Sequence, residues 1–548
     1  MMLLVSELYM RGSVGLIIGE TGTLDFKFLV SDSTAVMRGH YVKVWHETDS
    51  SWVLAQVMSI TRSSDSFSVE EAKKGKRNNR DDDHIVAEAN VIGSRGSDGL
   101  LRSPKTPFSP GDPIYVADNE LIRNVLGLVG GNMYVGLLDG TDIPVHLDAN
   151  NLVQKHCSIL AKTGSGKSYT AAVLLEELLE HNVPLLIIDP HSEYGSLKEA
   201  ASGNGKDSAK YKVTPKGYGS KVKVYTPANK FINPNADELF RLNGVNLKPK
   251  ELIDLFPDNY TTTHTGILYE SIHKLRAEVD TYFLEDIIRE VSNNESKARW
   301  NVINLLEDVN QMELLSPNPT PVEELMQEGK ASIIDLKGIP PDIQSMVVAK
   351  LCENLFEARK MGHIPPGMLV VEEAHNFAPE RGFSKSASSE ILRTIASEGR
   401  KFGLGMMIIS QRPARVDKNV LSQCGTQIIM KVTNPNDLKS ISKGLEGANS
   451  YVEDELIRLP PGVAMLVSND IERPVLVDVR VRRSKHGGES VNVLKASSGK
   501  RKSTTKKVAV APAQSSATSP PPKREPTRKP KSGREEKGLF KKLFGSEK

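Results

Sequence analysis

One short segment of the sequence carries residues whose types and spacing suit phosphate chemistry. It reads Ala161-Lys162-Thr163-Gly164-Ser165-Gly166-Lys167-Ser168, with alanine in place of the usual first glycine of a phosphate loop. The small residues allow backbone N–H groups to close around a phosphate at the positive end of a helix. Lys167 can then reach the β- and γ-phosphates of ATP, and the hydroxyl of Ser168 can ligate Mg²⁺.

A glycine–serine linker is the plain alternative interpretation of this segment. An apolar run at 158–161 precedes it, and apolar residues at helical spacing follow it from 169 to 179. This pattern favours a strand, a loop and a helix in that order. We therefore expect Lys167 to act in catalysis and the loop with its following residue to bind the nucleotide. The nucleotide-binding residues expected here are Thr163, Gly164, Ser165, Gly166, Lys167, Ser168 and Tyr169.

Two adjacent carboxylates, Glu372 and Glu373, follow the apolar run 368–371. A carboxylate at the end of a strand can hold Mg²⁺ through water, while its neighbour orients and deprotonates the attacking water. We assign Glu372 to the metal and Glu373 to the catalytic base. Glutamates placed at a helix N-terminus because the helix dipole favours them are the structural alternative.

Two further polar residues are candidates for catalysis. Gln411 follows an apolar run, and its amide can bridge the γ-phosphate or the attacking water; a capping role for Ser410 is the alternative at this position. Arg400 ends a helical pattern just before Gly403, where its charge could simply complement the helix C-terminus. In a ring of subunits, an arginine at such a corner can instead enter the neighbouring nucleotide site and stabilise transition-state charge.

The elements that must position these residues alternate between strands and helices. Continuous apolar runs predict buried parallel strands at 183–189, 331–336, 368–371, 404–411 and 426–432, with a helix at 343–359 between two of them. This alternation predicts an α/β fold with a parallel, doubly wound sheet and helices on both faces. Residues 230–330, including 236–240, are rich in helix formers and predict a helical insertion.

The first 150 residues have a different pattern. Short strands are expected at 14–19, 24–30, 41–45 and 52–57, and their regular spacing predicts a small β-barrel. Charged residues crowd together between Glu70 and His84, which predicts a long solvated hairpin loop.

Composition limits the class of protein. A length of 548 residues predicts two or three domains and tails. No stretch approaches 18 uninterrupted apolar residues, so we expect no transmembrane helix and no stable membrane insertion. The three cysteines lie far apart, which excludes a disulfide framework and a zinc pattern and fits a cytoplasmic location.

The charge is unevenly distributed. Residues 484–548 hold 17 Lys and Arg against 5 Asp and Glu, a net charge of +12, which leaves −9 for the rest of a chain whose total is +3. This Lys-, Ser- and Pro-rich tail is expected to be disordered. Its end, 538–545, places Leu539, Phe540, Leu543 and Phe544 on one helical face. Partner docking, weak adhesion to lipid and a chance apolar cluster are the interpretations left open.

Taken in order, these motifs resemble those of the HerA-type ATPases, in the HerA/FtsK branch of RecA-like P-loop NTPases. The resemblance rests on the phosphate loop, on Ile188-Asp189-Pro190-His191-Ser192-Glu193-Tyr194 and on Val371-Glu372-Glu373-Ala374-His375. It also rests on Glu398-Gly399-Arg400-Lys401-Phe402-Gly403 and Ser410-Gln411-Arg412-Pro413. It implies an ATP-synthase-like barrel domain over 1–150 and a RecA-like ATPase domain over 151–483, followed by the tail.

The same resemblance implies a homohexameric ring that moves double-stranded DNA using ATP, with a NurA-type nuclease, in DNA end resection and repair. It places Arg400 at the arginine that acts on the neighbouring subunit, and Lys155 at a basic residue that senses the neighbouring nucleotide. A regulatory ATPase ring in a defence or signalling complex is the second hypothesis. A membrane-tethered DNA pump is a third, disfavoured hypothesis. Arg381 and Lys385, in the loop after the carboxylates, are expected either to contact DNA phosphates or to be ordinary solvated residues.

Overall fold

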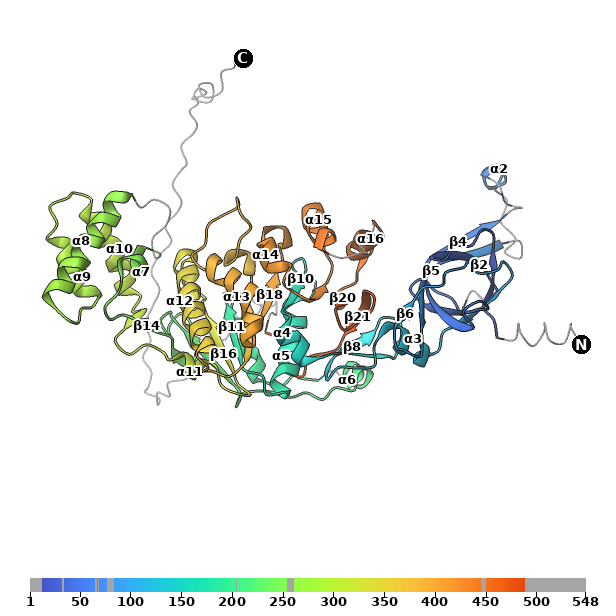
Figure 1. Cartoon of the computed structure of the whole chain (residues 1–548), viewed down its shortest axis with the longest axis horizontal. Helices are drawn as coiled ribbons and strands as arrows, with labels where there is room; N and C mark the ends of the chain where they lie inside the picture. Colours follow the sequence, from blue (N-terminus) through green and yellow to red (C-terminus); the bar gives the residue numbers. More distant parts are fainter. Residues whose placement is uncertain are drawn as a thin grey trace, which may run out of the picture. The chain divides into compact units, whose positions relative to one another are not determined.

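The computed structural model describes residues 12–31, 34–64, 67, 69–75, 83–203, 205–253, 261–444 and 450–487. Figure 1 shows the chain coloured along its sequence. The terminal apolar motif at 538–545 and nearly all of the basic tail lie outside the described residues.

The N-terminal strands form a closed barrel, as the sequence predicts. They are β1 (Gly15–Ile18), β2 (Asp25–Val30), β3 (Tyr41–His46), β4 (Ser51–Ser64), β5 (Asp83–Arg95) and β7 (Pro113–Val116), with β6 (Leu101–Arg102) paired to β5. The order is β2-β1-β7-β3-β4-β5, and a further pairing of β2 with β5 closes it. Phe26, Phe28 and Val30 alternate inward along β2, which is the two-residue period of a strand with one buried face.

The connection between β4 and β5 differs from the expected loop. A short helix, α2 (Val69–Lys73), lies within it. The segment has helix formers and no glycine before Gly75, so a turn of helix forms where charge density alone predicts solvated loop.

A second, larger sheet carries the phosphate loop. Its order is β13-β12-β16-β11-β17-β18-β10-β19-β20-β21-β8-β9. The strands are β8 (Met133–Leu138), β9 (Pro144–Leu147), β10 (Cys157–Leu160), β11 (Leu185–Asp189), β12 (Val222–Thr226), β13 (Glu238–Leu239), β16 (Ala331–Asp335), β17 (Gly367–Val371), β18 (Leu404–Ser410), β19 (Thr426–Ile429), β20 (Val463–Ser468) and β21 (Val475–Val479). Pairing is parallel from β13 through β19 and antiparallel from β19 to β9.

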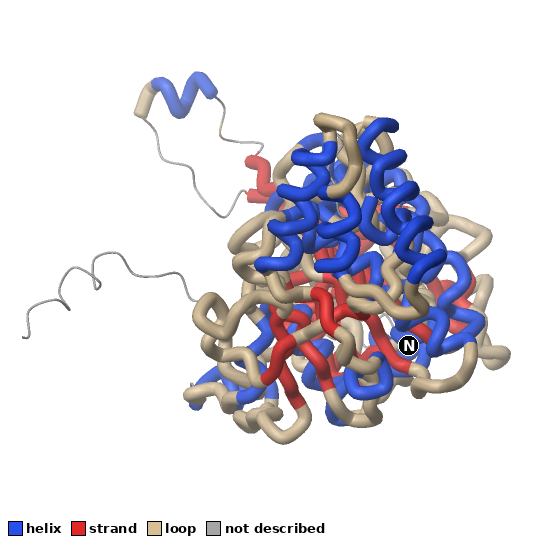
Figure 2. Tube along the Cα trace, turned by 90° about the vertical axis from the view of Figure 1, so that its left-hand side faces the viewer, coloured by secondary structure: helices blue, strands red, loops and turns tan. Residues whose placement is uncertain are grey.

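Helices cover both faces of this sheet, which confirms the doubly wound α/β fold (Figures 1 and 2). Along β11, Leu185 and Ile187 share a core with α5 (Lys167–Glu180), whereas Leu186 and Ile188 share a core with α12 (Pro341–Lys360) and α13 (Ser389–Phe402). Successive strand residues point to opposite faces, so a continuous apolar run is what a strand buried on both faces requires.

The ATPase sheet extends into the range expected for the barrel domain. β8 pairs with β21, and β9 pairs with β8, although both strands precede residue 150. Two helices, α3 (Asn119–Leu126) and α4 (Ala149–Gln154), flank these strands in the sequence. The pairing joins residues more than 300 positions apart, so no local pattern indicates it.

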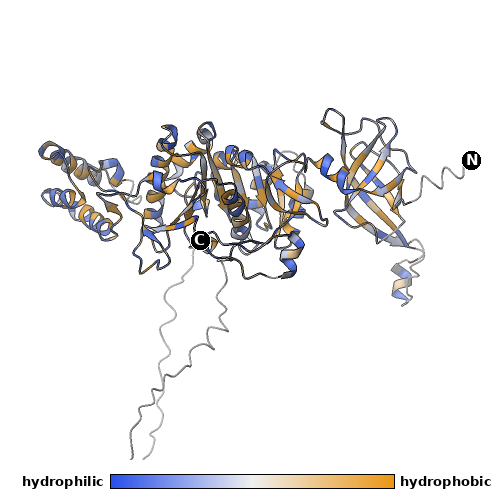
Figure 3. Cartoon of the chain, turned by 90° about the horizontal axis from the view of Figure 1, so that it is seen from below, coloured by the Kyte–Doolittle hydropathy of each residue, from blue (hydrophilic) through white to orange (hydrophobic). Residues whose placement is uncertain are grey.

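The expected helical insertion is present, but it is not helical throughout. It contains α7 (Pro249–Ile253), α8 (Thr262–Glu278), α9 (Leu284–Ser292), α10 (Arg299–Gln311) and α11 (Val322–Leu325), with the paired strands β14 (Leu242–Asn243) and β15 (Leu315–Ser316). Apolar and hydrophilic residues alternate along its helices (Figure 3). The segment 236–240, expected to be helical, instead contains β13, because Glu238 and Leu239 pair with β12 at the sheet edge.

Shorter elements complete the described chain. They are η2 (Tyr194–Lys198), α6 (Gly205–Tyr211), η3 (Ala374–Asn376), η4 (Pro413–Arg415), α14 (Lys418–Leu421), α15 (Pro435–Gly444) and α16 (Ser450–Arg458). The folded part also reaches beyond the expected boundary at residue 484. Ser484 is buried, and its backbone N–H and its hydroxyl both donate to Glu176 of α5, at 2.8 and 2.6 Å.

Candidate nucleotide site

The phosphate loop runs from the end of β10 to the first turn of α5. Gly164 and Gly166 have φ angles of +79° and +103°, in the left-handed region where residues with a Cβ are strained. A Cβ on Gly166 would also lie 3.1 Å from Cε of Met430. The two glycines therefore permit the tight turn that points backbone N–H groups at one place, at the N-terminus of α5.

Lys167 meets both predicted carboxylates. Its Nζ donates to Oε1 of Glu372 and lies 3.3 Å from Oε1 of Glu373. All three side chains are buried. β18 lies between β10 and β17, so the parallel order of the sheet places the loop after β10 and the carboxylates after β17 at one edge.

Glu372 is held by a residue that the sequence analysis did not identify as part of the site. The hydroxyl of Tyr194 donates to Oε2 of Glu372 at 2.6 Å, and Tyr194 is 1% exposed. Asp189 shapes this turn by accepting backbone N–H groups of His191 and Tyr194 at 3.2 and 3.0 Å. Burial raises the pKa of Asp189 to about 6. The polar cluster at 189–194 was the available signal, but it did not reveal this contact.

Glu373 has an unusual backbone conformation and a buried carboxylate oxygen without a hydrogen-bond partner among the described residues. Its φ is +50°, which is uncommon for a residue with a Cβ and places its side chain beside Lys167. Within the described residues, its buried Oε2 makes no hydrogen bond, although Nδ1 of His375 is 3.3 Å away. Burial lowers the pKa of His375, which favours its neutral form. One carboxylate oxygen of Glu373 is therefore buried without a hydrogen-bond donor among the described residues.

Gln411 and Ser410 lie across from the loop, at the end of β18. Thr163 donates its hydroxyl to Oε1 of Gln411, so the side chain of Gln411 is in contact with the phosphate loop. The hydroxyl of Ser410 accepts the backbone N–H of Arg412 at 3.0 Å and lies 3.1 Å from Nδ1 of His375. Ser410 therefore stabilises the turn, and Gln411 contacts the site.

Arg400 and Lys155 lie away from the phosphate loop of their own chain. Arg400 is in the last turn of α13, before β18 begins, and Lys155 precedes β10. Both are at the edge of the sheet opposite to the loop. β18 spans seven residues, roughly 20 Å, so neither side chain reaches the loop across the sheet.

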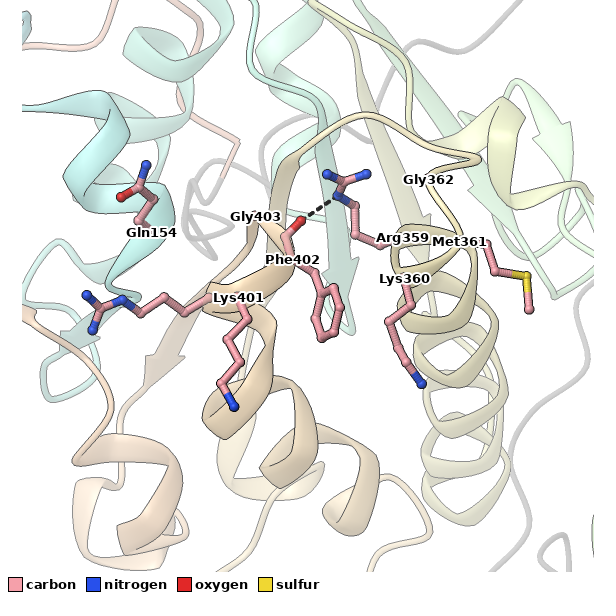
Figure 4. A pocket seen from close by; sticks show the side chains of 9 residues that line it. Gln154, Arg359, Lys360, Met361, Gly362, Lys401, Phe402 and Gly403 are labelled. Carbon is pink, nitrogen blue, oxygen red and sulfur yellow. Dashed lines mark hydrogen bonds between the residues drawn. The ribbon is translucent and has the colours of Figure 1, made fainter.

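Arg400 lines an open cavity of about 510 Å³. The same cavity is lined by Gln154, Arg359, Lys360 and Lys401 (Figure 4). The guanidinium of Arg359 is engaged, because it donates to the carbonyls of Phe402 at 2.6 Å and Ile364 at 2.8 Å. Lys360 is paired with Glu357 at 2.9 Å. Within the described residues Arg400 has no such partner, so its charge is available to an anion from outside the chain.

The site offers two protein oxygen groups of the kind that Mg²⁺ takes beside a nucleotide. Among the described residues, no group of three or more His, Cys, Asp or Glu side chains could hold a metal ion. Mg²⁺ at nucleotide sites typically takes one or two protein oxygens together with water and phosphate oxygens. Ser168, at the start of α5, and Glu372 offer a hydroxyl and a carboxylate of this kind.

Comparison with known proteins identifies relatives over most of the chain. A family model described as "Helicase HerA, central domain" matches residues 133–355, and one described as "HAS barrel domain" matches residues 14–95. A probable helicase of Methanocaldococcus jannaschii is 29% identical, with 88% of this chain and 93% of the relative covered. The DNA double-strand break repair helicase HerA of Sulfurisphaera tokodaii is 28% identical, with 88% and 95% covered.

Among solved structures, VirB4 of Thermoanaerobacter pseudethanolicus matches with a TM-score of 0.46 and 17% identity, covering 64% of this chain and 97% of that one. In the described part of this chain, no helix is long and apolar enough to cross a membrane.

The sheet order, the loop between β10 and α5, and the carboxylates after β17 define a P-loop ATPase, an enzyme that hydrolyses ATP. The family matches and the relatives narrow this class: the chain is similar to the HerA-type ATPases over most of its length.

Proposed function

We propose that this chain forms a homohexameric ring that uses ATP to move along double-stranded DNA. In this proposal it works with a NurA-type nuclease in DNA end resection. Two findings support the DNA substrate: the match to the HerA helicase central domain, and relatives of nearly the same length that are named DNA double-strand break repair helicases. The arrangement of Lys167, Glu372 and Glu373 supports hydrolysis as the source of energy.

In the proposed reaction, a water molecule attacks the γ-phosphorus of ATP. A bond forms between the water oxygen and this phosphorus, the bond from the phosphorus to the β–γ bridging oxygen breaks, and the water proton passes to Oε2 of Glu373. This oxygen is buried and makes no hydrogen bond within the described residues. Lys167, which here contacts both carboxylates, turns to the β- and γ-phosphates when ATP binds.

Ser168 and Glu372 would hold Mg²⁺, which neutralises charge on the β- and γ-phosphates when bound. Tyr194 fixes the orientation of Glu372 through its hydrogen bond to Oε2. Gln411, hydrogen-bonded to Thr163, is positioned to contact the γ-phosphate or the attacking water. These residues bind and orient, and Glu373 alone accepts the proton.

The observation that carries the ring proposal is the separation of Arg400 from its own phosphate loop. Arg400 lies at the opposite edge of the sheet, in a cavity open to solvent, with no ion pair among the described residues. Packing this edge against the phosphate-loop edge of the next subunit would place Arg400 beside the neighbouring γ-phosphate. Lys155 lies at the same edge and would approach the same nucleotide.

DNA-stimulated hydrolysis by the purified chain tests the proposal. We expect duplex DNA to raise the rate of ATP hydrolysis several-fold, and light scattering to give the mass of a hexamer. The Glu373→Gln variant is the control for contaminating ATPases, because it should bind ATP and hydrolyse it very slowly with or without DNA. A rate that duplex DNA leaves unchanged would instead favour a regulatory ATPase ring. Co-purification with a nuclease tests the proposed partner.

A further inference from the structure

A second cavity lies beside the phosphate loop, on the side away from the catalytic carboxylates. It has a volume of about 430 Å³ and is lined by Lys162 and Thr163 of the loop, by Gln411, Arg412 and Arg415, and by residues 432–434 and 436–437 after β19. β10 lies between β18 and β19 in the sheet, whereas the carboxylates follow β17 on the far side of β18. The cavity therefore shares Thr163 and Gln411 with the nucleotide site and lies toward β19, away from the carboxylates after β17.

The charge and polarity of this cavity fit an anion. Three cationic side chains line it, and within the described residues none of them forms an ion pair. Its single carboxylate, Asp437, accepts the backbone N–H of Ala414 at 3.0 Å. The remaining polar lining consists of hydroxyl and amide groups, which can donate hydrogen bonds to phosphate oxygens. The net positive lining disfavours an arginine from another subunit as the occupant.

An aromatic side chain holds one of these cations in place. The guanidinium of Arg415 lies 5.5 Å from the ring centre of Phe383, which also lines the cavity and is 59% exposed. Phe383 belongs to the loop between the carboxylates and α13, so four chain segments converge here. Arg412 and Arg415 are themselves exposed, and this suits a long polyanion passing over the opening better than a small ligand enclosed by protein.

Gln411 connects the cavity to the nucleotide site, because it lines the cavity and contacts the phosphate loop. Oε1 of Gln411 accepts the hydroxyl of Thr163, and the amide nitrogen of Gln411 makes no hydrogen bond within the described residues. This nitrogen can donate to an anion in the cavity while Oε1 remains in contact with the phosphate loop. Binding in the cavity would therefore bias the position of a side chain that also contacts the loop.

From this geometry we propose that the cavity binds the phosphate backbone of duplex DNA through Arg412, Arg415 and Lys162, and that Gln411 transmits this contact to the nucleotide site. The inference rests on the proposed function, because it takes the double-stranded DNA of that proposal as the ligand of the cavity. It assigns the DNA contact to residues beside the phosphate loop, which are distinct from Arg381 and Lys385 in the loop after the carboxylates.

The test compares the Arg412→Gln/Arg415→Gln variant of the full chain with the wild type and with Lys439→Gln. Lys439 lies on α15, is exposed and does not line the cavity. Binding of a fluorescent DNA duplex is measured by anisotropy across a series of salt concentrations. Binding of a fluorescent ATP analogue is measured in parallel. The DNA concentration for half-maximal stimulation of hydrolysis is the third measurement.

We expect the double variant to weaken DNA binding about tenfold and to reduce the slope of log affinity against log salt by about 2, because two phosphate contacts are lost. Lys439→Gln should behave like the wild type in all three measurements. DNA binding and salt slope that equal those of the wild type would overturn the inference, and so would a variant that loses only ATP affinity. A wild-type chain whose hydrolysis ignores DNA would instead contradict the proposed function.

Discussion

At the scale of single residues, the candidate site pairs one buried cation with two buried carboxylates. Lys167 neutralises two carboxylates, and Tyr194 donates to the oxygen of Glu372 that Lys167 does not contact. Glu372 is fully buried, so an oxygen without a partner there would carry a cost of about 1–3 kcal/mol. We interpret Tyr194 as a positioning residue, because it acts on the site through Glu372.

Tyr194→Phe tests this role. The variant removes one hydroxyl and keeps the ring that fills the core. We expect a roughly fivefold increase in the Mg²⁺ concentration for half-maximal hydrolysis, corresponding to about 1 kcal/mol for one hydrogen bond. ATP affinity without Mg²⁺ should be unchanged, since Lys167 and the loop remain intact. Tyr211→Phe, another tyrosine of the same domain, is the matched control. Equal loss of affinity with and without Mg²⁺ would show that Tyr194 supports the fold rather than Glu372.

The sequence predicted the residues that stand in local motifs, but not those that reach the site from elsewhere in the chain. Glu372, Glu373 and Gln411 follow apolar runs, so their position at strand ends can be predicted, and Lys167 is identified by the phosphate-loop motif. The structure brings these residues together. The contact between Tyr194 and Glu372 joins residues 178 positions apart, and only the packed sheet reveals it.

At the scale of elements, the helix that begins at the phosphate loop is fixed by the end of the ATPase domain. The guanidinium of Arg480 donates to Glu176 at 2.9 Å and to Glu177 at 2.7 Å, and all three side chains are buried. Glu176 also accepts the backbone N–H of Ser484, as well as that of Arg483 at 3.0 Å. A buried ion pair contributes little by itself, but the loss of one partner leaves an uncompensated charge.

Glu176→Gln should therefore destabilise the domain. We expect a loss of about 3 kcal/mol, because the remaining charge of Arg480 and the N–H groups after it lose an acceptor. The thermal unfolding midpoint, measured at fixed protein concentration without nucleotide, reports the change. Glu180→Gln is the control, since Glu180 pairs with the half-exposed Lys216 at 2.6 Å and its loss should cost less than about 1 kcal/mol. Equal shifts in the two variants would contradict the role of the buried pair.

Helices and strands could be predicted where their hydrophobic pattern determines them. They could not be predicted where pairing with a distant strand determines them. β11 and β17 are continuous apolar runs buried on both faces, so their sequences identify them. β13 forms because two residues of unremarkable propensity complete the edge of β12. The composition after Arg483 predicts the start of a basic tail. Ser484 is nevertheless held in place by a hydrogen bond to Glu176, 308 positions earlier.

At the scale of the whole molecule, the barrel and the α/β sheet follow from strand spacing and from the alternation of strands and helices, and both are present. The ring does not follow from pattern. Its expectation came from the resemblance, and its support here is that Arg400 and Lys155 lie at the edge of the sheet opposite to the phosphate loop. If two subunits complete each site, two variants that are inactive alone should recover activity when they are mixed in one ring.

Arg400→Ala and Glu373→Gln should each abolish hydrolysis, the first by removing a transition-state contact and the second by removing the base. If the chain forms the proposed hexamer, rings made by co-expressing the two variants should recover activity, because some sites combine Glu373 of one subunit with Arg400 of the next. At equal expression, about one quarter of the sites are complete in this sense. Mixing Arg400→Ala with the Arg400→Ala/Glu373→Gln double variant is the control and should recover nothing.

A second pair of variants separates this role from helix capping. Arg400→Lys keeps the positive charge at the end of α13, so it should preserve activity if the charge only complements the helix dipole. An arginine that contacts phosphoryl oxygens through its planar, multidentate guanidinium cannot be replaced in this way, and we expect Arg400→Lys to lose hydrolysis. Lys360→Ala removes another cation from the same cavity and should leave the rate close to that of the wild type. The shared-site role would be contradicted if Arg400→Lys were active and the mixed rings recovered no activity. Arg400 would then only complement the dipole of its own helix, α13, and would not contact the neighbouring nucleotide.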